Sequence, residues 1–132
     1  MVLTFAWHVD ADADVERALL HDKGEQAARI SQGIEAGQRI LESWVLRCHG
    51  RMLAEDGTKG SAQLDAEYLE ELTDIVEQVE HATEARMQVG VGASTGEAVM
   101  ALKVAEKRGG VPAIVLYTPD LSEEAREPGG AL

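Results

Sequence analysis

The hydrophobic and polar positions of the first 50 residues follow two different periods. The apolar run Val2–Val9 is rich in β-forming residues, so it predicts a buried strand that ends at an aspartate. Residues 12–21 have the composition of a short helical turn. From residue 23 to residue 49 the apolar side chains recur at helical spacing, and Gly50 follows as the expected helix end.

The middle of the chain predicts a hairpin, a second helix and another strand. Residues 51–55 and 61–64 are short strand candidates on either side of Asp56-Gly57, a dipeptide typical of hairpin turns. Residues 65–84 carry apolar side chains at spacings of three and four, which indicates an amphipathic helix. Residues 86–93 alternate in the manner of a strand.

The C-terminal third predicts one more helix and one more strand. The helix is expected to start with Thr95 as its cap and to end near Arg108, before a glycine pair. Residues 112–117 form the last predicted strand, and residues 118–132 are expected to be a flexible acidic tail. The order β-α-β-β-α-β plus an added α-β unit predicts a single α+β domain over residues 1–117. Its expected fold is ferredoxin-like, with an antiparallel-rich sheet and helices on one face.

The charge of the chain is strongly negative. It contains 24 acidic and 12 Lys or Arg residues among 132, for a formal net charge of −12. Such a field disfavours duplex nucleic acid and anionic membrane surfaces as partners. Residues 65–84 hold much of this charge, on positions expected to form the solvated face of a helix.

Cysteine usage and the N-terminal run bear on localisation. The single cysteine, Cys48, has no intramolecular disulfide partner, so we expect a reducing, cytoplasmic compartment. The apolar run that opens the chain is too short for a membrane span and follows no basic segment, so neither a membrane helix nor a signal peptide is expected.

A second acidic cluster directly follows the first predicted strand. Asp10, Asp12 and Asp14 alternate with alanines, and Glu16 comes next. Carboxylates delivered to the end of a strand are candidate Mg²⁺ ligands, and the alternative is that they cap or solvate a turn. Neighbouring positions of a regular strand face opposite ways, so joint ligation by Asp10 and Asp12 requires the chain to turn at Ala11.

Three sequence blocks, in this order, resemble the palm-type nucleotide cyclase and polymerase superfamily. The first is Asp10-Ala11-Asp12 after its strand, and the others are V-G-V-G-A-S-T-G-E-A (89–98) and A-L-K-V-A-E-K-R-G-G (101–110). The superfamily includes GGDEF diguanylate cyclases, the archaeal GTP cyclohydrolase III family and the minimal CRISPR polymerases. The resemblance spans about residues 3–117 and implies a palm fold.

The resemblance also implies roles for particular residues. Mg²⁺ (or Mn²⁺) would be held by a set of carboxylates comprising Asp10, Asp12, Glu55 and Asp56. Asp10 and Asp56 would be catalytic, meeting across neighbouring strands. The nucleotide would be bound by the Ala11 carbonyl, by Thr95 at a helix N-terminus, and by Lys103 and Lys107.

Two departures from the superfamily pattern affect these assignments. Active cyclases carry Gly-Gly-Asp-Glu or a similar turn where this chain reads E-D-G-T-K-G over residues 55–60. Ungapped counting from Lys103 places Glu106 at the position of the superfamily lysine, whereas counting back from Gly110 selects Lys107, which we favour. The two lysines could instead simply complement a helix C-terminus.

Three functional hypotheses follow from the resemblance. The leading one is a metal-dependent nucleotidyltransferase that converts a purine nucleoside triphosphate (GTP or ATP) into a cyclic mono- or oligonucleotide, acting as a homodimer. The second is GTP hydrolysis of the cyclohydrolase III type. The third is a catalytically degenerate nucleotide-binding or regulatory module, which the altered hairpin turn favours.

Overall fold

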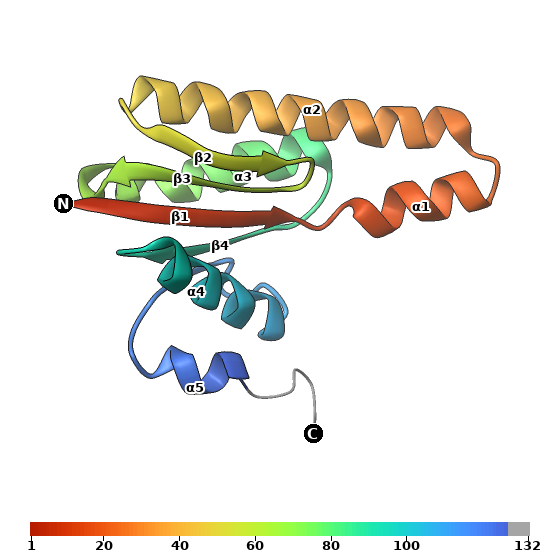
Figure 1. The fold of residues 1–132 in the computed structure, drawn as a ribbon. Helices are drawn as coiled ribbons and strands as arrows, with labels where there is room; N and C mark the ends of the chain where they lie inside the picture. The colour runs from red at the N-terminus through yellow and green to blue at the C-terminus, as the bar shows by residue number, and fades with distance from the viewer. Residues whose placement is uncertain (127–132) are drawn as a thin grey trace.

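The computed structural model describes the backbone of residues 1–126 and their side chains except those of residues 12–15 and 126. The elements in chain order are β1 (Val2–Val9), α1 (Asp12–Leu20), α2 (Gly24–Arg47), β2 (Arg51–Asp56), β3 (Lys59–Asp65), the 3₁₀ helix η1 (Ala66–Glu71), α3 (Leu72–Thr83), β4 (Met87–Gly92), α4 (Thr95–Lys107), β5 (Ile114–Leu116) and α5 (Leu121–Arg126). This order confirms the predicted ferredoxin-like core with one added α-β unit (Figure 1).

The five strands form one mixed sheet in the order β2-β3-β1-β4-β5. β1 is antiparallel to both neighbours, and its Trp7 lies opposite Gly60 of β3 and Val89 of β4. Only the added strand β5 runs parallel to its partner β4. Within the hairpin, β3 takes the inner position because its Ala62 and Leu64 are buried, whereas nearly all of β2 is exposed.

Helices cover both faces of the sheet, so the expectation of helices on one face was wrong. Val89 of β4 packs into the main core with α2 and α3, and the same core holds Phe5 and Trp44 with their rings 6.0 Å apart. On the opposite face of β4, Gly90 lies against α4. Figure 1 shows α4 and α5 on the side of the sheet away from α2. The second face of β4 carries glycine, which gives the backbone of α4 room to approach.

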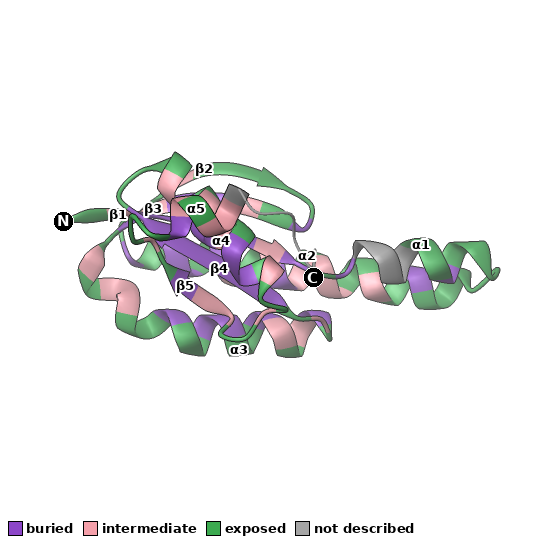
Figure 2. Cartoon of the chain, turned by 90° about the horizontal axis from the view of Figure 1, so that it is seen from below, coloured by how far each residue is buried: buried purple, intermediate pink, exposed green. Residues whose placement is uncertain are grey.

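The buried residues form two clusters. Figure 2 shows them on the inner strands and on the helix faces that meet the sheet, while α1 lies beyond the end of the sheet. The larger cluster joins β1, β3 and β4 to α2 and α3, and the smaller one joins α4 to β5 and to Leu121 of α5. Among the described residues, no helix combines the length and apolar character that crossing a membrane requires.

The C-terminal segment contains more structure than the sequence interpretation expected. A flexible tail from residue 118 was predicted, but α5 forms and packs on α4, where Arg108 pairs with Glu124 at 2.9 Å. Residues 127–132 of the predicted tail lie outside the described residues. The sequence did carry a helix signal here, since Glu123 and Glu124 lie in the first turn.

Candidate functional site

The C-terminal end of β1 is held between β3 and β4. The Val9 N–H donates to the Thr58 carbonyl at 2.7 Å, and the Asp10 N–H donates to the Arg86 carbonyl at 2.8 Å. Ala11 is buried, and its N–H donates back to the Val9 carbonyl at 2.9 Å. The chain therefore turns at Ala11, as joint ligation by Asp10 and Asp12 would require, and leaves the Asp10 side chain exposed at the strand end.

Asp56 does not lie on a strand next to β1, so the expected meeting with Asp10 across neighbouring strands was wrong. Asp56 is opposite Lys59, and Lys59 is in turn opposite His8 of β1. Two strand spacings, about 10 Å, therefore separate Asp56 from β1. The Asp12 side chain lies outside the described residues.

Glu55 belongs to the contact between the hairpin and α2. Partial desolvation, together with hydrogen bonding to and repulsion from the neighbouring Glu42 carboxyl, raises the pKa of Glu55 from 4.5 to about 7. The Gln38 side-chain amide donates to the Gly57 carbonyl in the same contact. Within the described part of the chain, no three His, Cys, Asp or Glu side chains lie close enough together to hold a metal ion.

The C-terminal end of α4 lies at the same end of the sheet as Asp10. There Lys107 Nζ donates to the carbonyls of Glu124 at 3.1 Å and Ala125 at 2.8 Å, so this amine binds α5. Glu106, the alternative position for the superfamily lysine, has Oε1 3.2 Å from His8 Nδ1 of β1. The Glu106 carboxylate therefore faces the sheet near the end of β1. Lys103, the other predicted phosphate contact on α4, is exposed.

Thr95 lies at the opposite end of the sheet from Asp10. β4 ends at Gly92, which is opposite Thr4 near the start of β1. Thr4 is five residues, or about 16 Å, from Val9 at the end of β1. Thr95 is also not the cap of α4, because the Ser94 side chain accepts the Glu97 N–H at 3.2 Å.

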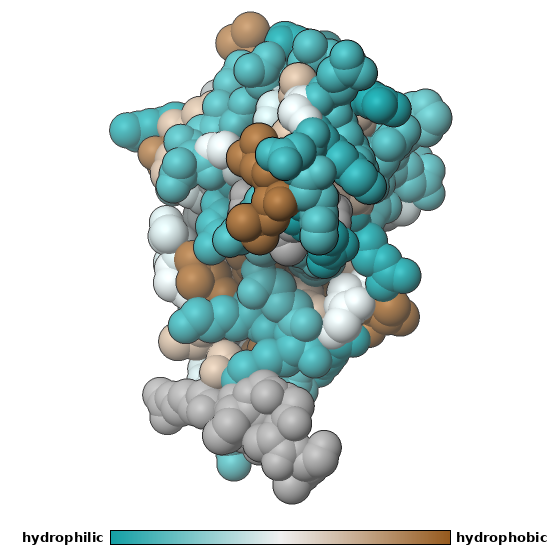
Figure 3. Space-filling model, turned by 90° about the vertical axis from the view of Figure 1, so that its right-hand side faces the viewer, coloured by the Kyte–Doolittle hydropathy of each residue, from teal (hydrophilic) through white to brown (hydrophobic). Residues whose placement is uncertain are grey.

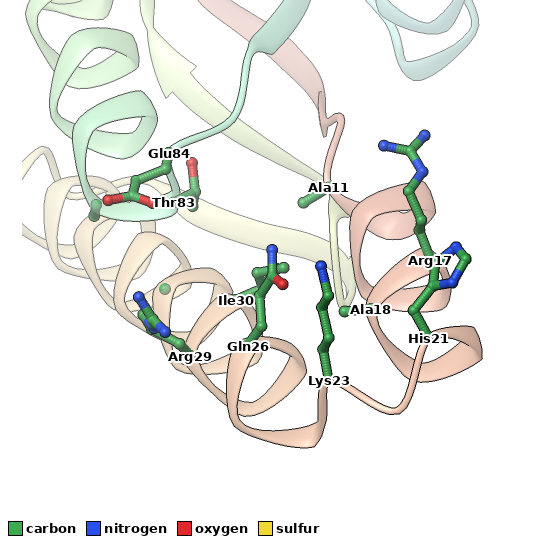
Figure 4. A pocket seen from close by; sticks show the side chains of 12 residues that line it. Ala11, Arg17, Ala18, His21, Lys23, Gln26, Arg29, Ile30, Thr83 and Glu84 are labelled. Atoms are coloured by element: carbon green, nitrogen blue, oxygen red, sulfur yellow. The ribbon is translucent and has the colours of Figure 1, made fainter.

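A cavity of about 400 Å³ lies between α1, α2 and the end of α3, beside the turn at Ala11. Figure 4 shows the Lys23 and Gln26 side chains directed from the start of α2 toward Ala11, with Thr83 and Glu84 on the other side. Its lining residues are Ala11, Arg17, Ala18, His21, Lys23, Gln26, Arg29, Ile30, Gly33, Ala82, Thr83 and Glu84. Asp10 is not among them.

The lining of the cavity is mainly basic among its ionisable groups. The basic residues are Arg17, His21, Lys23 and Arg29, which come from α1, from the connection that follows it and from α2. Within the described part of the lining, Glu84 is the one acidic residue. Figure 3 shows that this end of the molecule has a largely hydrophilic surface with a small apolar patch. The sequence pattern predicts no role for these basic residues, because they are scattered across a helix-helix connection and match no motif.

The comparisons with known proteins identify the fold. Neither a family model nor a curated protein matches the chain. Among solved structures, the active GGEEF domain of a diguanylate cyclase from Vibrio cholerae is 17% identical with a TM-score of 0.58, covering 89% of this chain and 83% of that one.

Two further solved structures give the same result. The GGDEF domain of the PA2567 protein from Pseudomonas aeruginosa is 14% identical with a TM-score of 0.57, covering 89% of this chain and 84% of that one. An EAL/GGDEF domain protein from M. capsulatus is 15% identical with a TM-score of 0.52, covering 89% and 85%. The resemblance to the palm-type superfamily is therefore confirmed at the level of the fold, which is that of GGDEF domains.

Proposed function

We propose that this chain is a nucleotide-binding module on a GGDEF-type palm fold, and that its cavity beside Ala11 binds a purine nucleoside triphosphate. The observation that carries the proposal is the set of basic side chains, including Lys23 and Arg29, around a cavity at the C-terminal end of β1. Its volume, about 400 Å³, is within the range of small-molecule sites. A basic lining in a chain of net charge −12 favours an anionic ligand.

The same geometry favours binding without nucleotidyl transfer. Phosphoryl transfer by two metal ions needs several carboxylates directed at one point. Asp56 lies two strands from β1, and Glu55 is engaged with Glu42 of α2. The described side chains therefore do not fit a two-ion Mg²⁺ or Mn²⁺ site, and Glu106 is the residue that faces His8 near the end of β1.

A metal-dependent cyclase is the second candidate function. It is favoured by Asp10, whose exposed carboxylate follows β1 directly beside the turn at Ala11, and by the similarity of the fold to GGDEF domains. In this alternative the chain acts as a homodimer and forms a cyclic nucleotide from GTP or ATP. No observation on this chain favours the cyclohydrolase alternative, but the same experiment tests it.

The test is incubation of the full chain with each nucleoside triphosphate and Mg²⁺ or Mn²⁺, with products resolved by mass and binding measured in parallel. The module proposal predicts binding without any new product. A cyclic product with pyrophosphate that disappears in Asp10→Ala would replace it with the cyclase, and a formamidopyrimidine would indicate ring opening. Absence of nucleotide binding under every metal condition would refute the proposed function.

A further inference from the structure

The cavity concentrates positive charge in an acidic protein. The chain has 12 Lys and Arg residues, and three of them, Arg17, Lys23 and Arg29, line this one cavity. His21 adds an imidazole ring, and Glu84 is the one acidic residue among the lining side chains that the structure describes. Asp22 and Glu25 adjoin Lys23 and Arg29 in a neighbouring hollow, so the basic excess is a property of the cavity lining itself, where it suits an anionic ligand.

Two of these cations have no partner within the described part of the chain. Neither Lys23 nor Arg29 forms an ion pair or a side-chain hydrogen bond there. Lys23 occupies the N-cap of α2, where a cation opposes the helix dipole. In Figure 4 its side chain extends toward Ala11 alongside the Gln26 amide. An anion in the cavity would accept hydrogen bonds from both cations and relieve this unfavourable placement.

We infer that the cavity binds the phosphate chain of the nucleotide, and that the base contributes little to the affinity; this inference rests on the proposed function. Ammonium and guanidinium groups offer only donors, which suits phosphate oxygens because these are acceptors. A purine base instead presents donors and acceptors along one edge. Among the lining side chains that the structure describes, acceptors come only from Gln26, Thr83 and Glu84, apart from a histidine ring nitrogen. Inorganic tripolyphosphate is therefore a ligand of this cavity in its own right.

The experiment is calorimetric titration of the full chain, without metal, with inorganic tripolyphosphate, with ATP and GTP, and with adenosine and guanosine. Tripolyphosphate and the nucleotides are expected to compete with similar affinities, and the nucleosides are expected not to bind. Lys23→Gln and Arg29→Gln should each weaken tripolyphosphate binding about tenfold, which corresponds to one charge-assisted hydrogen bond. Lys23→Arg, which keeps the charge, should retain most of the affinity.

The matched control is Arg39→Gln, which removes the same charge from an exposed position of α2 outside the cavity. It should change the affinity by less than about twofold, because exposed charges at a distance are screened by salt. Circular dichroism of each variant confirms that it is folded.

The possible outcomes separate the two proposals. Nucleotide binding without tripolyphosphate binding, or equal affinities for wild type, Lys23→Gln and Arg29→Gln, would overturn the inference and leave the proposed function standing. Tripolyphosphate binding without nucleotide binding would refute the proposed function and the assignment of the bound phosphates to a nucleotide, and would leave the cavity as a site for inorganic polyphosphate. Binding of neither would refute both.

Discussion

Replacing Gly90 with alanine tests the close approach of α4 to the sheet. A Cβ atom at this position would overlap the Ala98 carbonyl oxygen and the Leu102 nitrogen, and would lie 2.8 Å from the Leu102 Cα. All three are backbone atoms, so no side-chain rotation relieves the overlap. The variant can fold only if α4 moves away from β4.

The expected loss of stability follows from two opposing effects. Forcing an extra carbon into a packed interior costs about 1–3 kcal/mol, and contact with backbone atoms places Gly90→Ala at or above the upper end. Alanine also lowers the conformational entropy of the unfolded chain, which stabilises the folded state by about 0.4–1 kcal/mol. The net destabilisation should therefore be about 2 kcal/mol or more, which lowers the melting temperature by roughly 6–10 °C in a domain of this size.

Urea unfolding followed by tryptophan fluorescence measures this change, because Trp7 and Trp44 are both buried in the core. Gly24→Ala is the control, since a Cβ atom there would meet nothing within 4 Å. The control should be neutral or slightly stabilised. If the two variants differ by less than about 0.5 kcal/mol, α4 does not lie against β4 as described and the reasoning is refuted.

Three further predictions concern individual side chains. Ser94→Ala should cost about 1 kcal/mol by removing the cap of α4, while Thr95→Ala should cost clearly less in the same urea assay. Because folding raises the pKa of Glu55 from 4.5 to about 7, the folded state binds more protons between those values and loses stability as the pH rises through them. Glu55→Gln should therefore lose less stability than wild type between about pH 5 and pH 8, and a control Glu77→Gln should follow wild type. Lys107→Met should make α5 more sensitive to limited proteolysis, because the amine binds two α5 carbonyls, and should leave nucleotide affinity unchanged.

The elements that the sequence predicts well are those whose burial is encoded locally. The apolar run Val2–Val9 coincides with β1, and the helical spacing from residue 23 coincides with α2. Both patterns extend over many residues, so each identifies its strand or helix without information from the rest of the chain. The predicted cap of α4 was wrong by one residue, because Ser94 and Thr95 are both suitable cap residues. The structure distinguishes them, since Ser94 has the extended backbone of an N-cap and its side chain accepts the Glu97 N–H.

The order of strands could not be read from such local patterns. A hairpin can place either of its strands against β1, and the position of Asp56 relative to Asp10 depends on that choice. The structure places β3 inside because Ala62 and Leu64 fill the core. The basic cavity was missed for a related reason, since its lining extends from Ala11 to Glu84 and forms only when α1, α2 and α3 come together.

The net charge of −12 does not describe the electrostatic potential inside the cavity. Asp65 lies opposite Val2 at the start of β1, where it also contacts the N-terminal amine at 3.5 Å. The cavity adjoins the other end of β1, seven residues or about 23 Å away along the strand. At physiological ionic strength exposed charges are largely screened beyond about 8 Å, so acidic residues at that far end barely oppose an anion here. Asp22 and Glu25 do adjoin Lys23 and Arg29, so binding of a polyphosphate rests on direct contact of its oxygens with these two cations, which an acidic protein can still provide.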